Sequence, residues 1–140
     1  AIKNSKKVAM SLSDKFCVER HKPHFLDLVK NKLDIIFANE EEIMSLIDAN
    51  DFDEVINFAK EINKHLIVTR GEKGAISILR DKISEIGVKN NLKIVDLTGA
   101  GDLFAAGYLH ELIKNSSPKK CLEKGTELSS RIIQQIGARF

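Results

Sequence analysis

Residues 96–107 read DLTGAGDLFAAG and combine acidic and small residues at a spacing that could do chemistry. Gly99, Ala100 and Gly101 carry little or no side chain, so their backbone N–H groups can converge on an anion. Asp102 follows them directly, in the expected first turn of an apolar helix. Because a helix N-terminus favours negative charge, the stretch is a candidate anion-binding turn with a carboxylate beside it.

Asp102 is the candidate for acid–base chemistry. A carboxylate can take a proton from an attacking hydroxyl, while nearby N–H donors stabilise a transferring phosphoryl group. Phosphoryl transfer requires this pairing of positioning and charge stabilisation. The alternative is an Asp that only caps a helix, which taken alone is the commoner case. With its neighbours considered, we predict Asp102 as a catalytic base and the amides of Gly99, Ala100 and Gly101 as an anion hole.

A second polar segment, Asn39 to Glu42, follows the apolar run at residues 34–38. Taken alone, the segment is best explained as an acidic first turn that complements a helix dipole.

A third segment contains Thr69, Gly71 and Gly74, after the apolar run at residues 65–69. Glycines between two strands are common, so this pattern alone is a weak signal. Taken alone, it predicts a turn between two strands.

These segments must be positioned by alternating strands and helices. The runs expected to form strands are 8–13, 34–38, 65–69, 75–79, 82–86 and 93–96, and the expected helices are 22–30, 40–47, 52–62, 100–114 and 118–136. This alternation predicts a three-layer α/β fold, a mostly parallel sheet with helices on both faces. In such sheets ligands bind at the carboxyl ends of strands, where the polar segments are found.

Composition bounds the class of protein. The 140 residues fit one domain, and the net charge of +2 with scattered Lys residues argues against a nucleic-acid partner. No apolar run is long enough to predict a membrane span. Cys17 and Cys121 lack metal-site or disulfide spacing, so we expect reduced thiols in a cytoplasmic protein.

The stretch at residues 96–107 matches the pattern D-x-x-G-A-G-D-x-F-x-x-G and resembles the signature of the ribokinase-like (PfkB) carbohydrate and nucleoside kinases. Leu97 departs from it, since the family usually has a small or hydroxyl residue there. The resemblance implies transfer of the γ-phosphoryl group of ATP, with Mg²⁺, to a small-molecule hydroxyl. Asn39 to Glu42 is similar to the family's N-x-x-E motif, which implies that Asn39 and Glu42 organise Mg²⁺ through its waters; oxygen groups of this kind suit an ion that keeps several waters. Beside the glycine-rich turn we favour this interpretation over a plain helix-start role. Residues 69–74 are similar to the family's T-x-G-x-x-G nucleotide loop, which implies that Thr69, Gly71 and Gly74 contact ATP.

The same resemblance assigns further roles. Thr126 would face the adenine region of ATP. Asp96, Thr98 and the carbonyls near Gly137 would form a site for a monovalent cation such as K⁺. Ordinary strand-end and helix-cap chemistry is the alternative for these residues.

Complete members of the family are roughly twice as long, with a Gly-Gly substrate motif and a small β lid that nothing here matches. The chain begins at Ala1 without Met, so we expect it to be the C-terminal half of a larger protein. Such a piece would expose sheet edge and apolar helix faces, and we expect it to self-associate. Residues 11–21 look similar to bacterial adenosine-kinase-like members and could border the substrate pocket, or could be a polar loop.

Three alternatives stay open at this point. The acceptor could be a sugar, as in a ribokinase or fructokinase, instead of a nucleoside such as adenosine. The chain could bind nucleotide without catalysing transfer. A dinucleotide-binding fold is disfavoured because the turn at Gly99 and Gly101 lacks the later glycine and the acidic residue on a following strand.

Overall fold

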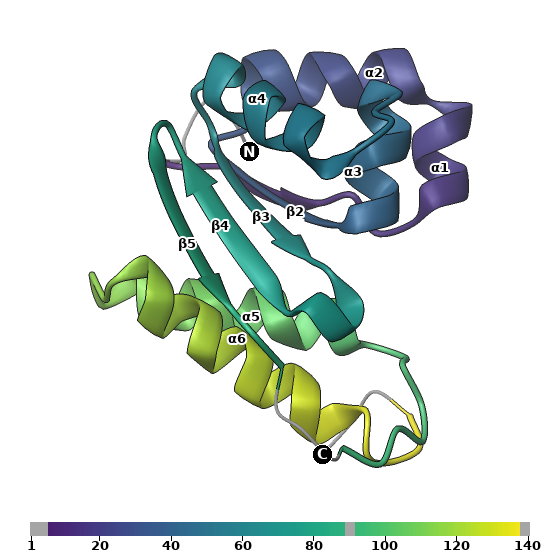
Figure 1. Cartoon of the computed structure of the whole chain (residues 1–140), viewed down its shortest axis with the longest axis vertical. Helices are drawn as coiled ribbons and strands as arrows, with labels where there is room; N and C mark the ends of the chain where they lie inside the picture. Colours follow the sequence, from purple (N-terminus) through teal and green to yellow (C-terminus); the bar gives the residue numbers. More distant parts are fainter. Residues whose placement is uncertain (1–5, 89–91, 138–140) are drawn as a thin grey trace. The chain divides into compact units, whose positions relative to one another are not determined.

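The structure is a computed structural model, and it describes residues 6–88 and 92–137. Within these residues one sheet has the strand order β1-β2-β3-β4-β5, with β1, β2 and β3 parallel. The strands are β1 Ala9–Ser11, β2 Ile35–Asn39, β3 His65–Thr69, β4 Ala75–Leu79 and β5 Lys82–Ile86 (Figure 1). The helices are α1 Lys15–Arg20, α2 Lys22–Asp27, the π-helix η2 Leu28–Lys32, α3 Glu40–Ile47, α4 Phe52–Ile62, the 3₁₀-helix η3 Gly71–Lys73, α5 Ala100–Ile113 and α6 Pro118–Ile132. The predicted α/β fold with a mostly parallel sheet is confirmed.

The chain forms two compact units. The first contains the described residues up to Thr69 together with Ser77–Ile83, and the second contains Arg70–Ile76 and the described residues from Ser84 onward.

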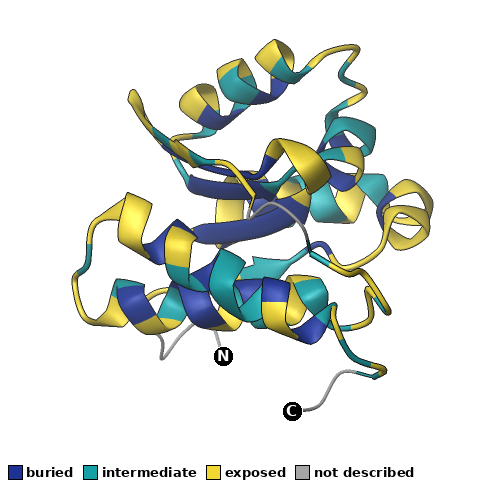
Figure 2. Ribbon diagram, turned by 60° about the horizontal axis from the view of Figure 1, so that its bottom comes forward, coloured by how far each residue is buried: buried dark blue, intermediate teal, exposed yellow. Residues whose placement is uncertain are grey.

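The core of the first unit is built on β2 and β3. Ile35–Ala38 and His65–Val68 are all buried, as Figure 2 shows for the central strands. Continuous apolar runs of this kind are typical of parallel strands covered on both faces. A buried polar pair also lies here, because His65 Nε2 is 2.8 Å from Ser77 Oγ. Burial, followed by the charge of Lys7, lowers the pKa of His65 to about 4.

Helices α3 and α4 begin and end where the sequence predicts. The side chain of Asn39 accepts a hydrogen bond from the N–H of Glu42 at the start of α3, and Asp51 accepts one from Glu54 at the start of α4. Both helices end at a residue in the left-handed conformation, Asp48 and Asn63 respectively. Such caps satisfy backbone groups that the helix itself leaves unpaired, so local sequence defines both ends.

Four predictions in the first unit differ from the structure. Strand β2, predicted at residues 34–38, begins and ends one residue later, at Ile35–Asn39. Residues 22–30 form α2 followed by the π-helix η2, which ends with the Leu33 N–H donating to the Leu28 carbonyl. Part of the segment 11–21 is helical, because the Asp14 carboxylate accepts from the N–H groups of Phe16 and Cys17 and starts α1. Strand β1 is shorter than predicted and partly exposed, as befits a strand at the edge of the sheet order.

The second unit contains a hairpin of α5 and α6 whose backbones approach closely. A Cβ on Gly107 would lie 2.8 Å from the Lys124 carbonyl oxygen, and a Cβ on Gly125 would lie 2.8 Å from that of Phe104. Only glycine permits this contact, because real Cβ atoms do not approach backbone so closely. The apolar side chains buried on these two helices are Phe104, Tyr108, Cys121, Leu122 and Ile132.

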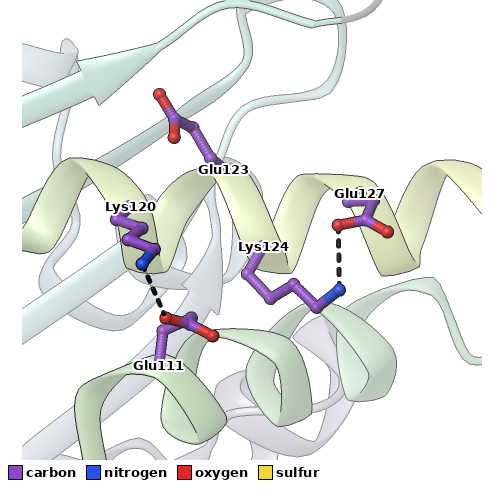
Figure 3. A pocket seen from close by; sticks show the side chains of 5 residues that line it. All are labelled: Glu111, Lys120, Glu123, Lys124 and Glu127. Atoms are coloured by element: carbon purple, nitrogen blue, oxygen red, sulfur yellow. Dashed lines mark hydrogen bonds and ion pairs between the residues drawn. The ribbon is translucent and has the colours of Figure 1, made fainter. Parts of the chain in front are cut away.

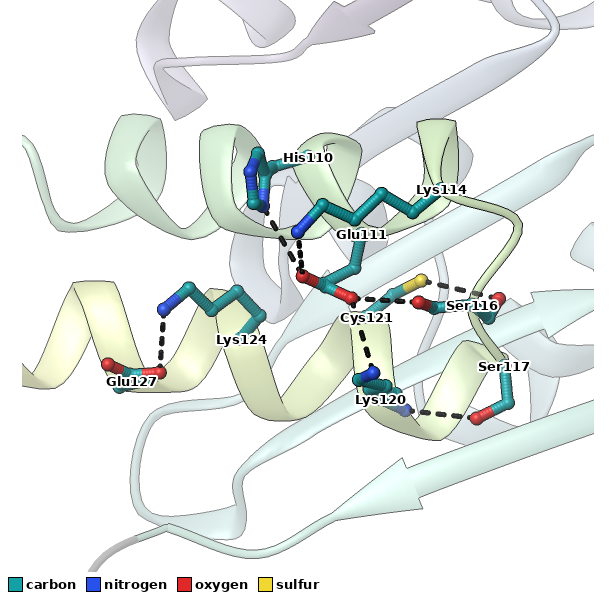
Figure 4. Close-up of polar contacts among 9 residues, drawn as sticks. All are labelled: His110, Glu111, Lys114, Ser116, Ser117, Lys120, Cys121, Lys124 and Glu127. Carbon is teal, nitrogen blue, oxygen red and sulfur yellow. Dashed lines mark hydrogen bonds and ion pairs between the residues drawn. The ribbon is translucent and has the colours of Figure 1, made fainter.

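The buried carboxylate of Glu111 ties the turn between the two helices (Figure 4). It accepts a hydrogen bond of 2.7 Å from Ser116 Oγ and one of 3.2 Å from Lys114 Nζ, and Lys120 Nζ lies 3.8 Å away. The hydrogen bonds from Ser116 and then Lys114 lower the pKa of Glu111 to about 2. The group is therefore ionised and paired at neutral pH.

The predicted strand at residues 93–96 is wrong. The N–H groups of Val95 and Asp96 both donate to the carbonyl of Ile133, at 2.7 and 3.2 Å, and not to a neighbouring strand. Helix α6 also ends at Ile132, before the predicted end at residue 136, since the following residues form this irregular contact. Among the described residues, no helix has the length and apolar character that a membrane span requires.

Candidate active site

The carboxyl ends of β2 and β3 bring together the first group of predicted residues. Asn39 is the register partner of Thr69 across the parallel pair, so the two end side by side. Glu42 lies one turn into α3 and is tied to Asn39 by three hydrogen bonds. Its Oε2 accepts from the Asn39 N–H at 2.9 Å, its Oε1 from Nδ2 at 2.8 Å, and its own N–H donates to Asn39 Oδ1 at 2.8 Å. This reciprocal arrangement is a capping box.

The carboxylate of Glu42 is unusual for an N-terminal helix residue because it is only 6% exposed. Burial raises its pKa, and the hydrogen bond from the Asn39 backbone opposes that rise. Each oxygen of Glu42 has two lone pairs, and one on each is used by Asn39. The remaining lone pairs can accept hydrogen bonds from water molecules bound to a metal ion. The site therefore suits an ion that keeps its waters better than an ion bound directly by protein ligands.

The predicted nucleotide loop forms a tight turn. The Arg70 N–H donates to the Gly74 carbonyl at 2.8 Å, and the Gly74 N–H donates to the Gly71 carbonyl at 3.0 Å. Gly71 has a φ of 56°, in the left-handed region that favours glycine. Gly74 has a φ of 91° with a ψ of −137°, a conformation that only glycine adopts readily. A Cβ on Gly74 would also collide with the carbonyl of Ile86. Both glycines therefore have a conformational reason to be present.

The predicted anion hole lies at the start of α5. Gly99 is the N-cap, with a φ of 77°, and the first intrahelical bond runs from the Leu103 N–H to the Gly99 carbonyl at 3.0 Å. The Ala100 N–H donates to the Leu97 carbonyl at 3.1 Å and closes the turn. In the part of the chain that the structure describes, the amides of Gly99 and Gly101 have no such partner. They are the donors that an anion at this helix N-terminus can use.

Asp102 lies in the first turn of α5 and is exposed. The helix behind it is held by the buried side chains of Phe104 and Tyr108 and by the close contact at Gly107. Gly107, the last glycine of the motif, thus serves packing, whereas Gly99 serves the turn through its positive φ. The arrangement presents a carboxylate to solvent, next to amides at the positive end of a helix.

Asp96 connects this turn to the end of the described chain. Its Oδ1 accepts from the Thr98 N–H at 2.9 Å and from Thr98 Oγ1 at 2.7 Å, and its Oδ2 accepts from the Gly137 N–H at 2.9 Å. The hydrogen bonds from Thr98, followed by that from Gly137, lower the pKa of Asp96. Thr126, which the resemblance places at the adenine region, is half-buried on α6.

The structure therefore groups the predicted residues in two places. Asn39, Glu42 and Thr69 lie together in the first unit, and the second unit holds Gly71, Gly74, Thr126 and the connected set Asp96, Thr98, Gly99, Ala100, Gly101, Asp102 and Gly137. Within residues 6–88 and 92–137, no cluster of three or more His, Cys, Asp or Glu residues could hold a metal ion.

Two features of the site escaped the sequence patterns. The hydrogen bond from Gly137 to Asp96 joins residues 41 positions apart, and no local pattern encodes it. Gly125 carries no motif, although its spacing within an otherwise helical pattern is the kind of signal that indicates close packing.

A separate pocket on the α5–α6 hairpin does not contain the predicted residues (Figure 3). Its lining is formed by charged side chains, which are Glu111, Lys120, Glu123, Lys124 and Glu127. Several of these are ion-paired, as in the 2.9 Å contact between Lys124 and Glu127. The pocket is a solvated groove of paired charges rather than a second candidate site.

Comparison with known proteins agrees with the motifs. Over residues 1–140 the chain matches the family model described as pfkB family carbohydrate kinase. It is 29% identical to a nucleoside kinase of Methanocaldococcus jannaschii over 84% of this chain and 38% of that protein. It is 30% identical to the adenosine kinase of Saccharomyces cerevisiae, over 100% of this chain and 44% of that protein. The chain thus spans less than half the length of these relatives.

Solved structures give the same result for the fold. A probable sugar kinase of Rhizobium etli superposes with a TM-score of 0.92 at 37% identity, covering 98% of this chain and 42% of that one. The adenosine kinase of Sinorhizobium meliloti superposes with a TM-score of 0.91 at 36% identity, covering 95% and 41% respectively. The sequence resemblance and the predicted fold class are both confirmed, and the chain belongs to the pfkB family of carbohydrate kinases.

Proposed function

We propose that the protein containing this chain transfers the γ-phosphoryl group of ATP to a hydroxyl group of a nucleoside or sugar, in the manner of an adenosine kinase. The observation that carries this proposal is the exposed carboxylate of Asp102 beside the amides of Gly99 and Gly101, which have no hydrogen-bond partner among the described residues. A base next to an anion-binding helix end is the minimal equipment for phosphoryl transfer.

In this reaction Asp102 accepts the proton of the attacking hydroxyl as its oxygen bonds to the γ-phosphorus of ATP. The bond from the γ-phosphorus to the β,γ-bridging oxygen breaks, and ADP leaves. The amides of Gly99 and Gly101 stabilise the charge on the phosphoryl oxygens in the transition state. The Ala100 amide was predicted to join them, but it would first have to leave the Leu97 carbonyl to which it now donates.

Asn39 and Glu42 are the residues that would hold Mg²⁺, through its waters. The remaining lone pairs of Glu42 fit that role, and the capping box fixes the carboxylate in one orientation. A bound Mg²⁺ would neutralise phosphate charge. Thr69, Gly71, Gly74 and Thr126 would contact ATP, as the resemblance to the family implies.

A monovalent cation such as K⁺ would be held beside the anion-binding turn by Asp96 and Thr98. Oδ1 of Asp96 already accepts two hydrogen bonds, so only Oδ2 keeps a lone pair after donation from Gly137. The carboxylate can therefore offer such a cation one direct oxygen contact.

The nucleoside assignment rests on two things, the adenosine and nucleoside kinases among the relatives and the segment at residues 11–21. Phe16 on α1 is 76% exposed just after β1 and could stack on a base. The match to a probable sugar kinase supports the rival assignment, in which the acceptor is a sugar. The coverage of less than half of each relative supports a third, in which this chain alone binds nucleotide without turnover.

The test is a phosphorylation assay of the full-length protein with Mg²⁺-ATP and three acceptors, adenosine, ribose and fructose. Selective turnover of adenosine supports the proposal as stated. Selective turnover of ribose or fructose replaces the nucleoside by a sugar. No transfer to any of the three, together with ATP binding measured by calorimetry, would favour the non-catalytic alternative.

A further inference from the structure

The carboxylate of Asp96 accepts three hydrogen bonds, and they come from two separate segments of the chain. Oδ1 faces the turn before α5, where Thr98 donates from both its N–H and its hydroxyl, at 2.9 and 2.7 Å. Oδ2 faces the segment after α6, where the Gly137 N–H donates at 2.9 Å. One carboxylate thus joins the segment that precedes α5 to the segment that follows α6.

The backbone around Asp96 strengthens the same connection. The N–H groups of Val95 and Asp96 both donate to the carbonyl of Ile133, one residue past the end of α6. Residues 95–98 therefore lie along the chain that leaves α6, although they belong to no strand. Gly137 itself has a φ of 82°, so the chain turns in a conformation that favours glycine where it meets the carboxylate.

The two segments that Asp96 joins correspond to two sides of the proposed nucleotide site, the phosphate side and the adenine side. The turn at residues 97–99 sets the position of the amides that would bind the phosphoryl group, through the left-handed Gly99 and the bond from Ala100 to Leu97. The segment at Gly137 follows α6, which carries Thr126, the residue proposed to face adenine. A hydrogen bond to a charged group is stronger than a neutral one, so the carboxylate is suited to hold both.

We propose that Asp96 is a positioning residue that fastens the segment at Gly137 to the anion-binding turn, so that the adenine side and the phosphate side of the nucleotide site are held together. Its link to nucleotide affinity rests on the proposed function, whereas the fastening itself does not. This role differs from holding a cation, because it uses the contacts that the carboxylate already makes within the chain.

The test compares Asp96→Ala and Asp96→Asn with Thr98→Val in the full-length protein. The Ala variant removes both acceptors. The Asn variant keeps the size of the side chain but turns one acceptor into a donor whichever way its amide faces. The matched control, Thr98→Val, removes the hydroxyl contact and leaves Oδ2 and Gly137 intact. An Ala variant that fails to fold leaves the Asn variant to decide.

The first measurement is hydrogen exchange of the backbone amides at residues 134–137, which needs no kinase activity. We expect exchange at Gly137 to accelerate about tenfold or more in Asp96→Ala, to accelerate less in Asp96→Asn, and to stay unchanged in Thr98→Val. Unchanged exchange in both Asp96 variants would overturn the fastening role even if the protein proves to be a kinase.

The second measurement separates the KM for ATP from the KM for the acceptor. We expect the Asp96 variants to raise the KM for ATP about tenfold with the KM for the acceptor unchanged, since a local loss on the nucleotide side should not reach the acceptor. Equal rises in both KM values, or faster exchange with an unchanged KM for ATP, would overturn the link to the nucleotide. Absence of all turnover in the unsubstituted protein would instead refute the proposed function and leave the exchange result standing.

Discussion

Adding one methyl group at Gly107 should push α5, which carries the candidate base Asp102, away from α6. The new Cβ would lie 2.8 Å from the Lys124 carbonyl oxygen, against 3.4 Å for the start of ordinary contact, so the backbones must part by the difference, 0.6 Å. The neighbour is backbone, which cannot rotate aside as a flexible side chain can. Overpacking of this kind costs about 1–3 kcal/mol, and the higher helix propensity of Ala returns up to about 1 kcal/mol. We therefore expect Gly107→Ala to lower the free energy of unfolding by about 1–2 kcal/mol.

The same reasoning predicts the behaviour of two companion variants. Gly101→Ala lies on the same helix with nothing within 4 Å of the new Cβ, so it should be neutral or slightly stabilising. Gly125→Ala meets the Phe104 carbonyl oxygen at 2.8 Å and should cost as much as Gly107→Ala. Because one separation of the helices relieves both clashes, the double variant should lose at least about 0.5 kcal/mol less than the sum of the single losses.

Urea denaturation followed by circular dichroism measures these free energies, with the slope of the transition checking that the mechanism of unfolding is unchanged. Gly107→Ala as stable as Gly101→Ala would refute the close backbone contact. Strict additivity of the two clashing variants would refute the shared separation.

Three further predictions concern stability elsewhere. Gly74→Ala should lose more than about 3 kcal/mol or fail to fold, because it combines a glycine-only conformation with a backbone collision, whereas Gly71→Ala should cost only about 1–2 kcal/mol; similar losses by urea denaturation would contradict this. Burial lowers the pKa of His65 to about 4. The stability that depends on its neutral form is therefore complete above its ordinary pKa near 6.5 and is lost as the pH falls from there toward 4. His65→Gln should abolish the resulting slope when the urea midpoint is plotted against pH. Hydrogen bonding, chiefly from Ser116, lowers the pKa of Glu111 to about 2, so its contribution is complete above pH 4.5 and is lost as the pH falls from 4.5 toward 2; Glu111→Gln should flatten this lower window and leave the slope due to His65 in place, and an unchanged profile would contradict it.

Local sequence was sufficient for most of the fold. The bounds of α3, α4, β3, β4 and β5 were predicted to the residue. Buried apolar runs set β3 and β4, the alternating sequence KISEI marks the exposed β5, and capping residues such as Asn39 and Asp51 set the helix starts. The expectation for α1 failed although its signal was present, since Asp14 stands where an N-cap should and the short helix has few apolar positions to reveal it.

The remaining errors depend on contacts between distant residues. Ile94 and Val95 are β-branched residues typical of strands, yet the N–H groups of Val95 and Asp96 donate to the carbonyl of Ile133 after α6. The hydrogen bond from Gly137 to Asp96 and the contact of Gly125 with Phe104 likewise join residues on separate elements. Motif spacing predicted which residues gather at the start of α5, but it could not predict that the Ala100 amide is already engaged by Leu97.

The most direct test of the central claim is the turnover number of Asp102→Asn in the full-length protein, measured with Mg²⁺-ATP and whichever acceptor is phosphorylated. Asn matches Asp in size and cannot accept the proton, and Asp102 is exposed, so folding and ATP binding should be preserved. If Asp102 is the catalytic base, kcat falls by about 10²–10⁴-fold while the affinity for ATP stays near that of the unsubstituted protein. A kcat close to that of the unsubstituted protein would contradict the assignment of Asp102 and, with it, the proposed mechanism.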